Sequence, residues 1–398
     1  MIQSLGLIFL CGLLLGSLFK KLKLPSLIGM LISGIVIGPY VLNLLDDSIL
    51  LIGPDLRELA LIIILTRAGL SLDIEDLKVI GRPAVLMSFV PALFEIAATI
   101  IFAPLLLNIT YMEAALLGAV IASASPAVIV PRMIKLMDEG YGTNRRIPQM
   151  ILAGDSVDDV FNIVIFTMLL SFHTTGTTNA LQLASVPISI ILGVIVGIVS
   201  GFILSIVFNK IHMHDSYKVI MVLGIAFLMV SLEKVLEGLV PISGLLAVMV
   251  QGIVIFKKQK VVADRLSAKF NKLWTGAEII LFVMVGATVN IGFATNYLWQ
   301  SILLLIIIIS IRAIGILATL IETNLNGKER FFCTLTGIPK ATVQAAIGGI
   351  PLAMGLQSGN VILSVAVIAI LVTAPLGALL IDSTYKKTLK SDKYIEKI

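Results

Sequence analysis

The chain has 398 residues, of which 58% are hydrophobic and 13% charged, and its mean hydropathy is +1.06. Soluble domains are nearer 45–50% apolar and ~25% charged, so this composition excludes an ordinary soluble domain. Apolar stretches of about 20 residues recur along the chain, which predicts membrane-spanning helices rather than the ~10-residue alternating strands of a barrel.

Charge and cysteine content exclude several further classes. A net charge of +5 could suggest nucleic acid as a partner, but the basic residues lie in loops, where they set membrane topology, so we expect no nucleic-acid binding. The two cysteines, Cys11 and Cys333, and the three histidines indicate neither a disulfide framework nor a resident metal site.

The apolar stretches predict an all-α polytopic membrane protein. The N-terminal stretch "MIQSLGLIFLCGLLLGSLFKK" has its charges after the apolar run and no small-residue cleavage site, so we interpret it as a retained first helix. Only "DSTYKKTLKSDKYIEKI" follows the last apolar stretch, and we expect no soluble regulatory domain. The 13 predicted spans are 3–19, 25–44, 57–72, 83–107, 113–136, 147–171, 184–208, 218–236, 241–256, 273–292, 299–321, 331–355 and 360–382.

The distribution of Lys and Arg predicts the orientation of these spans. If the first connection is cytoplasmic, 24 of the 29 basic residues fall in cytoplasmic connections, adjoining helix ends and the C-terminal tail. Lys78, Lys393 and Lys397 are among them, whereas the outer segments hold only Arg57 and Lys234. By the positive-inside rule, the N-terminus is expected outside and the C-terminus in the cytoplasm.

The predicted span 113–136 is interrupted by the sequence "AVIASASPAVIVPRM". Ser123, Ser125 and Pro126 fall at mid-depth. Proline removes a backbone donor and clashes with the preceding helical turn, and small polar residues beside it can bond the freed backbone groups. A broken helix is therefore expected here.

The predicted span 147–171 carries the stretch "GDSVDDVF" near its middle. Its three carboxylates, Asp155, Asp158 and Asp159, have i, i+3 and i+4 spacing and share one helix face, which Asn162 extends. A charge at the bilayer centre costs roughly 2.5–3.5 kcal/mol, so such residues need a functional or pairing reason. Three acids on one face repel one another, which makes a purely structural role a poor explanation.

The predicted span 299–321 carries one charge, Arg312, also near mid-membrane. Arginine is effectively never deprotonated and must be paired, and Asp155 and Asp158 are the expected partners. Glu95 lies centrally in its span, and Arg67 and Glu278 lie nearer the cytoplasmic ends of theirs. For each of these, a structural ion pair or a snorkelling side chain explains the position at least as well as a functional role.

The predicted span 331–355 is interrupted in the same way, by "TGIPKATVQAAIGGIPLAMG". Gly337, Pro339, Lys340 and Thr342 mark the break, and Lys340 could neutralise carbonyl groups there. Two broken helices seven spans apart, crossing in opposite directions, suggest an inverted repeat in which spans 1–6 match spans 8–13. This pattern is typical of secondary transporters, whose site lies where the broken helices meet.

These motifs together resemble the monovalent cation/proton antiporter superfamily, the sodium/proton exchangers, over essentially all of residues 1–398. The stretches that carry the resemblance are "KLPSLIGMLISGIVIGP", "LALIIILTRAGLSLD", the Ser-Pro break, "SVDDVF", "IRAIG" and "GIPKATVQAAIGGIPLA". The resemblance implies a homodimer with one transmembrane transporter domain per chain. Within it, it implies a mobile core at about 83–171 and 299–382, a scaffold at about 3–72 and 218–292, and a linker helix at about 184–208.

The resemblance also implies residue roles. Asp159 would carry the ion or the proton, Asp158 would be its neighbour and fellow Na⁺ ligand, and Arg312 would be the basic residue close by. Many members have Asn-Asp, or pair Asp-Asp with lysine, and some have Thr-Asp-Pro at the break where this chain has Ala124-Ser125-Pro126. The combination of Asp-Asp with an arginine, and the additional Asp155, leave the stoichiometry open.

The expected function is exchange of Na⁺ or Li⁺ for H⁺ across the cytoplasmic membrane of a prokaryote, with no cofactor beyond the transported ions. Asp159, Asp158, the Ser125 hydroxyl, freed carbonyl groups and water could form an oxygen shell for the cation. A K⁺/H⁺ exchanger and a sodium-coupled organic anion symporter remain alternatives. An intramembrane hydrolase is disfavoured, because its paired aspartates usually come from different helices.

Overall fold

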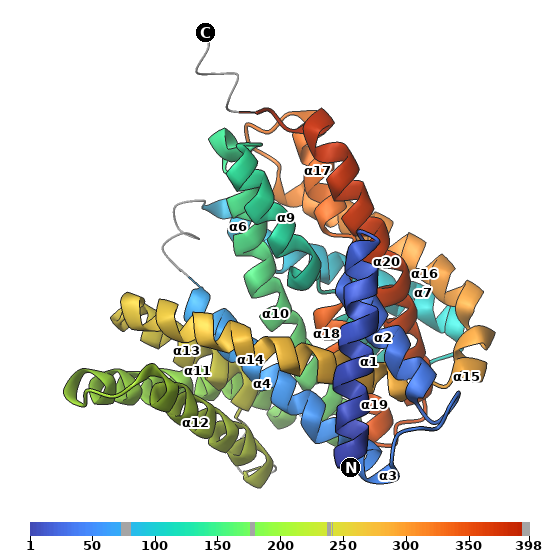
Figure 1. The fold of residues 1–398 in the computed structure, drawn as a ribbon. Helices are drawn as coiled ribbons and strands as arrows, with labels where there is room; N and C mark the ends of the chain where they lie inside the picture. Colours follow the sequence, from blue (N-terminus) through green and yellow to red (C-terminus); the bar gives the residue numbers. More distant parts are fainter. Residues whose placement is uncertain (73–80, 176–179, 237–239, 241, 392–398) are drawn as a thin grey trace. The chain divides into compact units, whose positions relative to one another are not determined.

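The regular elements of the structure are helices, as the composition predicts. The computed structural model describes residues 1–72, 81–175, 180–236, 240 and 242–391 (Figure 1). The helices of the first half are α1 (Ile2–Lys21), α2 (Ser26–Ile37), α3 (Asp47–Leu51), α4 (Gly53–Ser71), α6 (Arg82–Met87), α7 (Val90–Leu107), α8 (Tyr111–Ile121), α9 (Pro126–Glu139), a 3₁₀ turn (Thr143–Arg145) and α10 (Ile147–Thr175). Those of the second half are α11 (Ala180–Lys210), α12 (Asp215–Val235), α13 (Gly244–Lys258), α14 (Lys260–Ala287), α15 (Ile291–Asn296), α16 (Leu298–Thr319), α17 (Gly327–Thr336), α18 (Thr342–Ile347), α19 (Ile350–Ala353) and α20 (Gly359–Thr388).

Nine helical segments of the described residues are long and apolar enough to cross a membrane. The protein is therefore a polytopic all-α membrane protein. The predicted count of 13 includes four spans that do not meet this criterion. The span 25–44 corresponds to the 12-residue α2, 57–72 to the charged α4, 241–256 to the 15-residue α13, and 331–355 to the short helices α17, α18 and α19. Of the basic residues used to predict orientation, Lys78, Lys393 and Lys397 lie outside the described residues.

The chain divides into two compact units. The first unit comprises 1–54, 75–169 and 281–398, and the second comprises 55–74 and 170–280. Almost all of the predicted core, 83–171 and 299–382, falls in the first unit. The predicted scaffold is divided between the two, and the predicted linker helix falls in the second.

The centre of the first unit is built around α20. This helix, drawn in red in Figure 1, contacts α8, α9, α16, α17, α18 and α19. Its stretch Val361–Ile370 is buried throughout. Gly377 of α20 lies against the Pro339 ring so closely that an added Cβ would lie 2.5 Å from Pro339 Cγ. The absence of a side chain at Gly377 therefore lets the segment between α17 and α18 approach the helix axis.

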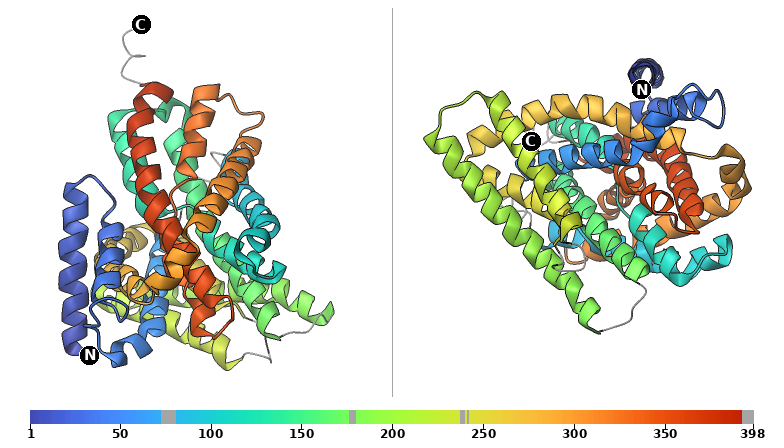
Figure 2. Two further views of the ribbon diagram at one scale, coloured as in Figure 1. Left: turned by 90° about the vertical axis from the view of Figure 1, so that its right-hand side faces the viewer. Right: turned by 90° about the horizontal axis from the view of Figure 1, so that it is seen from below.

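Close helix pairs complete the first unit. Helix α7 packs along α16 and also against α8, where a Cβ added to Gly118 would lie 3.1 Å from Ile96 Cα and 3.2 Å from Thr99 Cβ. Helices α1 and α2 lie side by side (Figure 2). Gly29 of α2 lies close to the backbone of Leu15 and Gly16 of α1.

The second unit is held mainly by α11 and α13. Gly193, Gly197 and Gly201 of α11 meet the backbone carbonyl groups of Ser243, Ala247 and Gln251, one helical turn apart each time. Small residues let two helix backbones approach closely, which is the usual basis of helix association in a membrane. Arg67 and Glu278 also belong to this unit, where their charges act on one another.

Candidate functional site

Two interrupted helical segments meet within the first unit. The helical run stops after Ile121 of α8 and resumes at Pro126 of α9, and it stops again after Thr336 of α17 and resumes at Thr342 of α18. The Ser125 backbone N–H donates to the Pro339 carbonyl at 2.9 Å. The non-helical segments are thus bonded directly to each other.

The carbonyl groups at and just after the end of α8 are bonded by side chains from α18, from the interruption before it and from α16. The Gln344 amide donates to the carbonyls of Ile121, at 3.2 Å, and Ser123, at 2.9 Å. The Ala122 carbonyl accepts from Arg312 and from Lys340 Nζ, the latter at 3.4 Å. A helix end leaves its last carbonyls unpaired and carries partial negative charge, and these donors provide both hydrogen bonds and positive charge.

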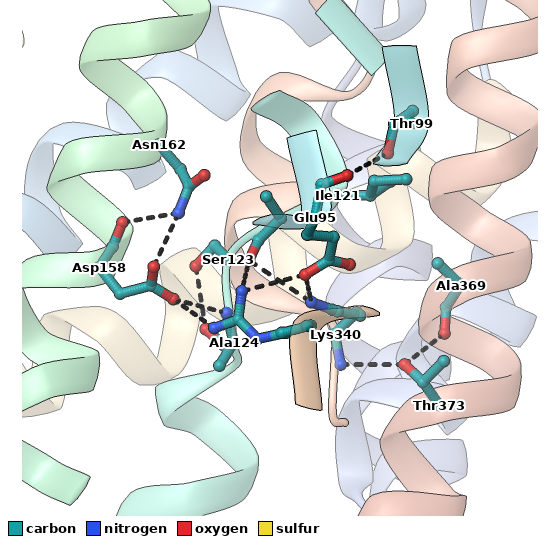
Figure 3. Close-up of polar contacts among 12 residues, drawn as sticks. Glu95, Thr99, Ile121, Ser123, Ala124, Asp158, Asn162, Lys340, Ala369 and Thr373 are labelled. Atoms are coloured by element: carbon teal, nitrogen blue, oxygen red, sulfur yellow. Dashed lines mark hydrogen bonds and ion pairs between the residues drawn. The ribbon is translucent and has the colours of Figure 1, made fainter. Parts of the chain in front are cut away.

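Glu95 of α7 bridges the two basic side chains. Its Oε2 accepts from Arg312 Nη1 at 3.0 Å and from Lys340 Nζ at 2.7 Å (Figure 3). Glu95 and Lys340 are fully buried and Arg312 is 3% exposed. Removing one partner of such a buried pair typically costs about 3–5 kcal/mol, because a buried charge is left uncompensated.

Asp158 of α10 is held from several directions. Its Oδ2 accepts from Arg312 Nη2 at 2.9 Å and from the Ala124 backbone N–H at 3.0 Å, and its Oδ1 accepts from the Asn162 amide at 3.0 Å (Figure 3). The side chain is completely buried. Of the two arginine partners considered from the sequence, Asp158 is therefore the one in hydrogen-bond contact.

Asp159 has a different environment from its neighbour. Its Oδ1 accepts from the Ser123 hydroxyl, and the side chain is only partly buried. Within the described part of the chain, no basic side chain forms an ion pair with it. The Ser125 hydroxyl, expected beside the acids, lies 3.2 Å from the Thr342 hydroxyl instead.

Asp155 lies one helical turn before the pair on α10. The residue is 7% exposed, and its Oδ2 is buried with no hydrogen-bond partner among the described residues. The charged groups near enough to act on it are Asp158, Arg312, Asp159 and Lys340.

Residues around the second interruption support Lys340 and Arg312. The Lys340 backbone N–H donates to the Thr373 hydroxyl at 2.9 Å (Figure 3). Gly337 leaves space for the arginine, since an added Cβ would lie 3.1 Å from Arg312 Nε and 2.5 Å from Ile316 Cδ1.

The importance of two residues of this site, Glu95 and Gln344, was not evident from the sequence. Glu95 looked as much like an isolated structural charge as a functional one, although its central position in an apolar span was the available signal. Gln344 was not singled out, yet a polar amide within "TVQAAIGG" is unusual in a buried segment. No cluster of three or more His, Cys, Asp or Glu suited to a resident metal occurs in the part of the chain that the structure describes. Where the two interrupted segments meet, most of the atoms that could act as metal ligands are oxygens, and oxygen ligands suit hard cations.

Comparison with known proteins agrees with these features. The family described as "Sodium/hydrogen exchanger, transmembrane" matches residues 5–386. The human sodium/hydrogen exchanger 9B2 is 31% identical over 94% of this chain and 73% of its own length. The human sodium/hydrogen exchanger 9B1 is 29% identical over 97% of this chain and 78% of its own length.

A solved structure shares the fold. The sodium proton antiporter MjNhaP1 from Methanocaldococcus jannaschii, at pH 8, superposes with a TM-score of 0.82 at 21% identity, over 97% of this chain and 98% of that one. The family match covers nearly the whole chain and includes both interruptions and the acidic helix between them. The chain therefore belongs to the sodium/hydrogen exchanger family, within the monovalent cation/proton antiporter superfamily of membrane transporters.

Proposed function

We propose that this protein exchanges Na⁺ or Li⁺ for H⁺, with cation and proton competing for the carboxylate of Asp159. The observation that carries the proposal is the difference between the adjacent acids. Asp158 accepts from Arg312, from a backbone N–H and from Asn162, whereas Asp159 accepts from the Ser123 hydroxyl and has no basic partner among the described residues. Of these two adjacent acids, Asp159 is therefore the one left to bind a transported ion.

Competition at one carboxylate provides the coupling. A cation displaces the proton on one side, the neutralised core shifts, and a proton displaces the cation on the other side. The empty site would carry a bare charge, which costs roughly 2.5–3.5 kcal/mol at the bilayer centre, so it crosses poorly. Asp158 and the carbonyl groups at the helix interruptions supply further oxygens for the cation.

Arg312 argues for near 1:1 exchange. Because its guanidinium does not lose its proton, the Asp158 it engages is neutralised throughout the cycle. One exchanging carboxylate then remains, and one proton moves for each monovalent cation.

The remaining architecture follows the same proposal. We place the 13 spans in the cytoplasmic membrane of a prokaryote, with the N-terminus outside and the C-terminus in the cytoplasm. The two interrupted segments would be corresponding parts of an inverted repeat. The core helices would move against a scaffold that also forms the homodimer.

K⁺/H⁺ exchange is the main alternative, because an oxygen shell of acids, hydroxyls and carbonyls does not by itself select Na⁺ over K⁺. A sodium-coupled symporter for an organic anion is less well supported, since such a protein needs a roomier polar cavity and the residues here offer mainly acids and small hydroxyls. Neither alternative has an observation that favours it over Na⁺/H⁺ exchange.

Proton flux in proteoliposomes tests the proposal. Purified wild-type protein should move protons in response to Na⁺ or Li⁺ gradients, and Asp159→Asn should abolish this movement. Asp138→Asn, the same substitution at an exposed position of α9, is the matched control and should behave as wild type. Retained cation-driven proton flux in Asp159→Asn would remove Asp159 as the carrier, and a response to K⁺ alone would favour the alternative exchanger.

Reversal potentials in the same vesicles test the stoichiometry. Near 1:1 exchange should be insensitive to an imposed membrane potential. A clear shift of the reversal point with potential would reject the 1:1 ratio while leaving antiport itself intact.

A further inference from the structure

Where the two interrupted segments meet, the buried acidic side chains outnumber the buried basic ones. Two basic side chains, Arg312 and Lys340, form ion pairs with two acids, Glu95 and Asp158. Their charges cancel within this group of four. Asp155 and Asp159 remain, so the site holds one more acid than single-carboxylate exchange requires.

Asp155 is the unexplained member. It shares a helix face with Asp158 and Asp159, so like charges lie one turn away. Its Oδ2 is buried and has no donor within the described residues, and no ion pair is formed with Arg312 or Lys340 there. An ionised carboxylate in such a place bears a desolvation cost that no hydrogen bond to Oδ2 offsets among the described residues, and neutralisation by a proton removes this cost.

We propose that Asp155 is a second proton-binding group. It keeps its proton throughout the exchange cycle, and exchange stops when this proton is lost. The proposal rests on ion exchange at Asp159. The groups that act on Asp155 are Asp158 and Asp159 on its own helix, Arg312 on α16, and Lys340 at the interruption between α17 and α18.

This assignment leaves the core without net charge whether Asp159 holds Na⁺ or H⁺. With Asp155 protonated, the four paired charges cancel, and Asp159 is neutralised by either Na⁺ or H⁺. With Asp155 ionised, each loaded core carries one uncompensated negative charge, and moving it through the membrane becomes unfavourable. Loss of this proton therefore sets the alkaline limit of exchange, independently of how many protons are available as substrate.

Sodium self-exchange isolates this effect, because it needs no proton release. Proteoliposomes with saturating Na⁺ on both sides are followed with radioactive sodium from about pH 6 to about pH 10, a range that spans perturbed carboxylates. Wild-type self-exchange should fall at the alkaline end. In Asp155→Asn, whose neutral amide mimics the protonated acid, it should persist to a pH higher by about one unit or more. Asp155→Glu retains a titratable group and should keep the alkaline fall.

Two results would overturn the proposal. One is a pH profile of Asp155→Asn that superposes on that of wild type. The other is loss of self-exchange in Asp155→Asn at every pH, in protein whose thermal unfolding and size-exclusion profile match wild type. The proposed function fails separately, if wild type shows no sodium self-exchange or if Asp159→Asn retains it.

Discussion

Ser123 and Ser125 lie two residues apart in the interruption between α8 and α9, but their hydroxyl groups have different partners. The Ser123 hydroxyl donates to Asp159, whereas the Ser125 hydroxyl lies beside that of Thr342. A hydrogen bond to a charged group is worth about 1.5–3 kcal/mol, and one between neutral groups about 0.5–1.5 kcal/mol. The two serines should therefore contribute unequally to ion exchange.

Ser123→Ala should raise the apparent KM for Na⁺ at fixed pH by roughly tenfold, which corresponds to about 1.4 kcal/mol. The hydroxyl supports the ionised form of Asp159, which is the form that accepts a cation, so its removal favours the proton. Ser125→Ala should change this KM less. Both values come from Na⁺ titrations of proton flux, and an equal or larger effect of Ser125→Ala would contradict this assignment of the serines.

Residue spacing predicted part of this site well. The face shared by the three acids follows from helical periodicity, and the need of Arg312 for an acidic partner follows from its permanent charge. The choice between Ser123 and Ser125 could not be predicted, because a non-helical segment has no periodicity from which to derive side-chain directions. The bridging role of Glu95 depends on contacts between α7, α16 and the segment before α18, which sequence spacing does not contain.

At the scale of elements, proline and glycine predicted where the helices stop, but not how many pieces result. The predicted span 331–355 is divided into α17, α18 and α19. Pro339 lies between α17 and α18, and Gly348 and Gly349 lie between α18 and α19. Glycine weakens a helix without dictating a break, so tertiary packing decides whether the helix continues.

Gly337→Ala tests how tightly the segment between α17 and α18 is packed. An added Cβ would meet Ile316 and the Arg312 side chain, and overpacking of this kind typically costs about 1–3 kcal/mol. We expect a lower Tm and slower exchange, because displacement of Arg312 disturbs its pairing with Asp158. Gly327→Ala is the matched control: it places the same methyl group in α17 where nothing lies within 4 Å, and it should stay within about 0.5 kcal/mol of wild type. Indistinguishable Tm and exchange rates for the two variants would show that this segment tolerates a side chain.

For the whole molecule, hydropathy alone predicted the class of the protein, since lipid leaves only helices or closed barrels. The number of spans was harder to derive, because α2 is short and α4 carries Arg57, Glu58 and Arg67. A charged or short helix can be accommodated inside a larger bundle without long apolar runs of its own. The orientation, in contrast, depends on a property summed over the whole chain, the unequal distribution of Lys and Arg.

Single cysteines, one after the second predicted span and one at the end of the last, test this orientation. In a Cys11→Ser, Cys333→Ser background, Asp47→Cys lies after the second predicted span and Lys387→Cys lies at the end of α20, and both positions are exposed. A membrane-impermeant maleimide added to intact cells should label Asp47→Cys and not Lys387→Cys, and inside-out vesicles should give the reverse. Because α20 is continuous to Thr388, labelling of Lys387→Cys reports the side on which the last span ends. Labelling of both positions from the same side would require an even number of spans between them, and one of the shorter helices would then not cross the membrane.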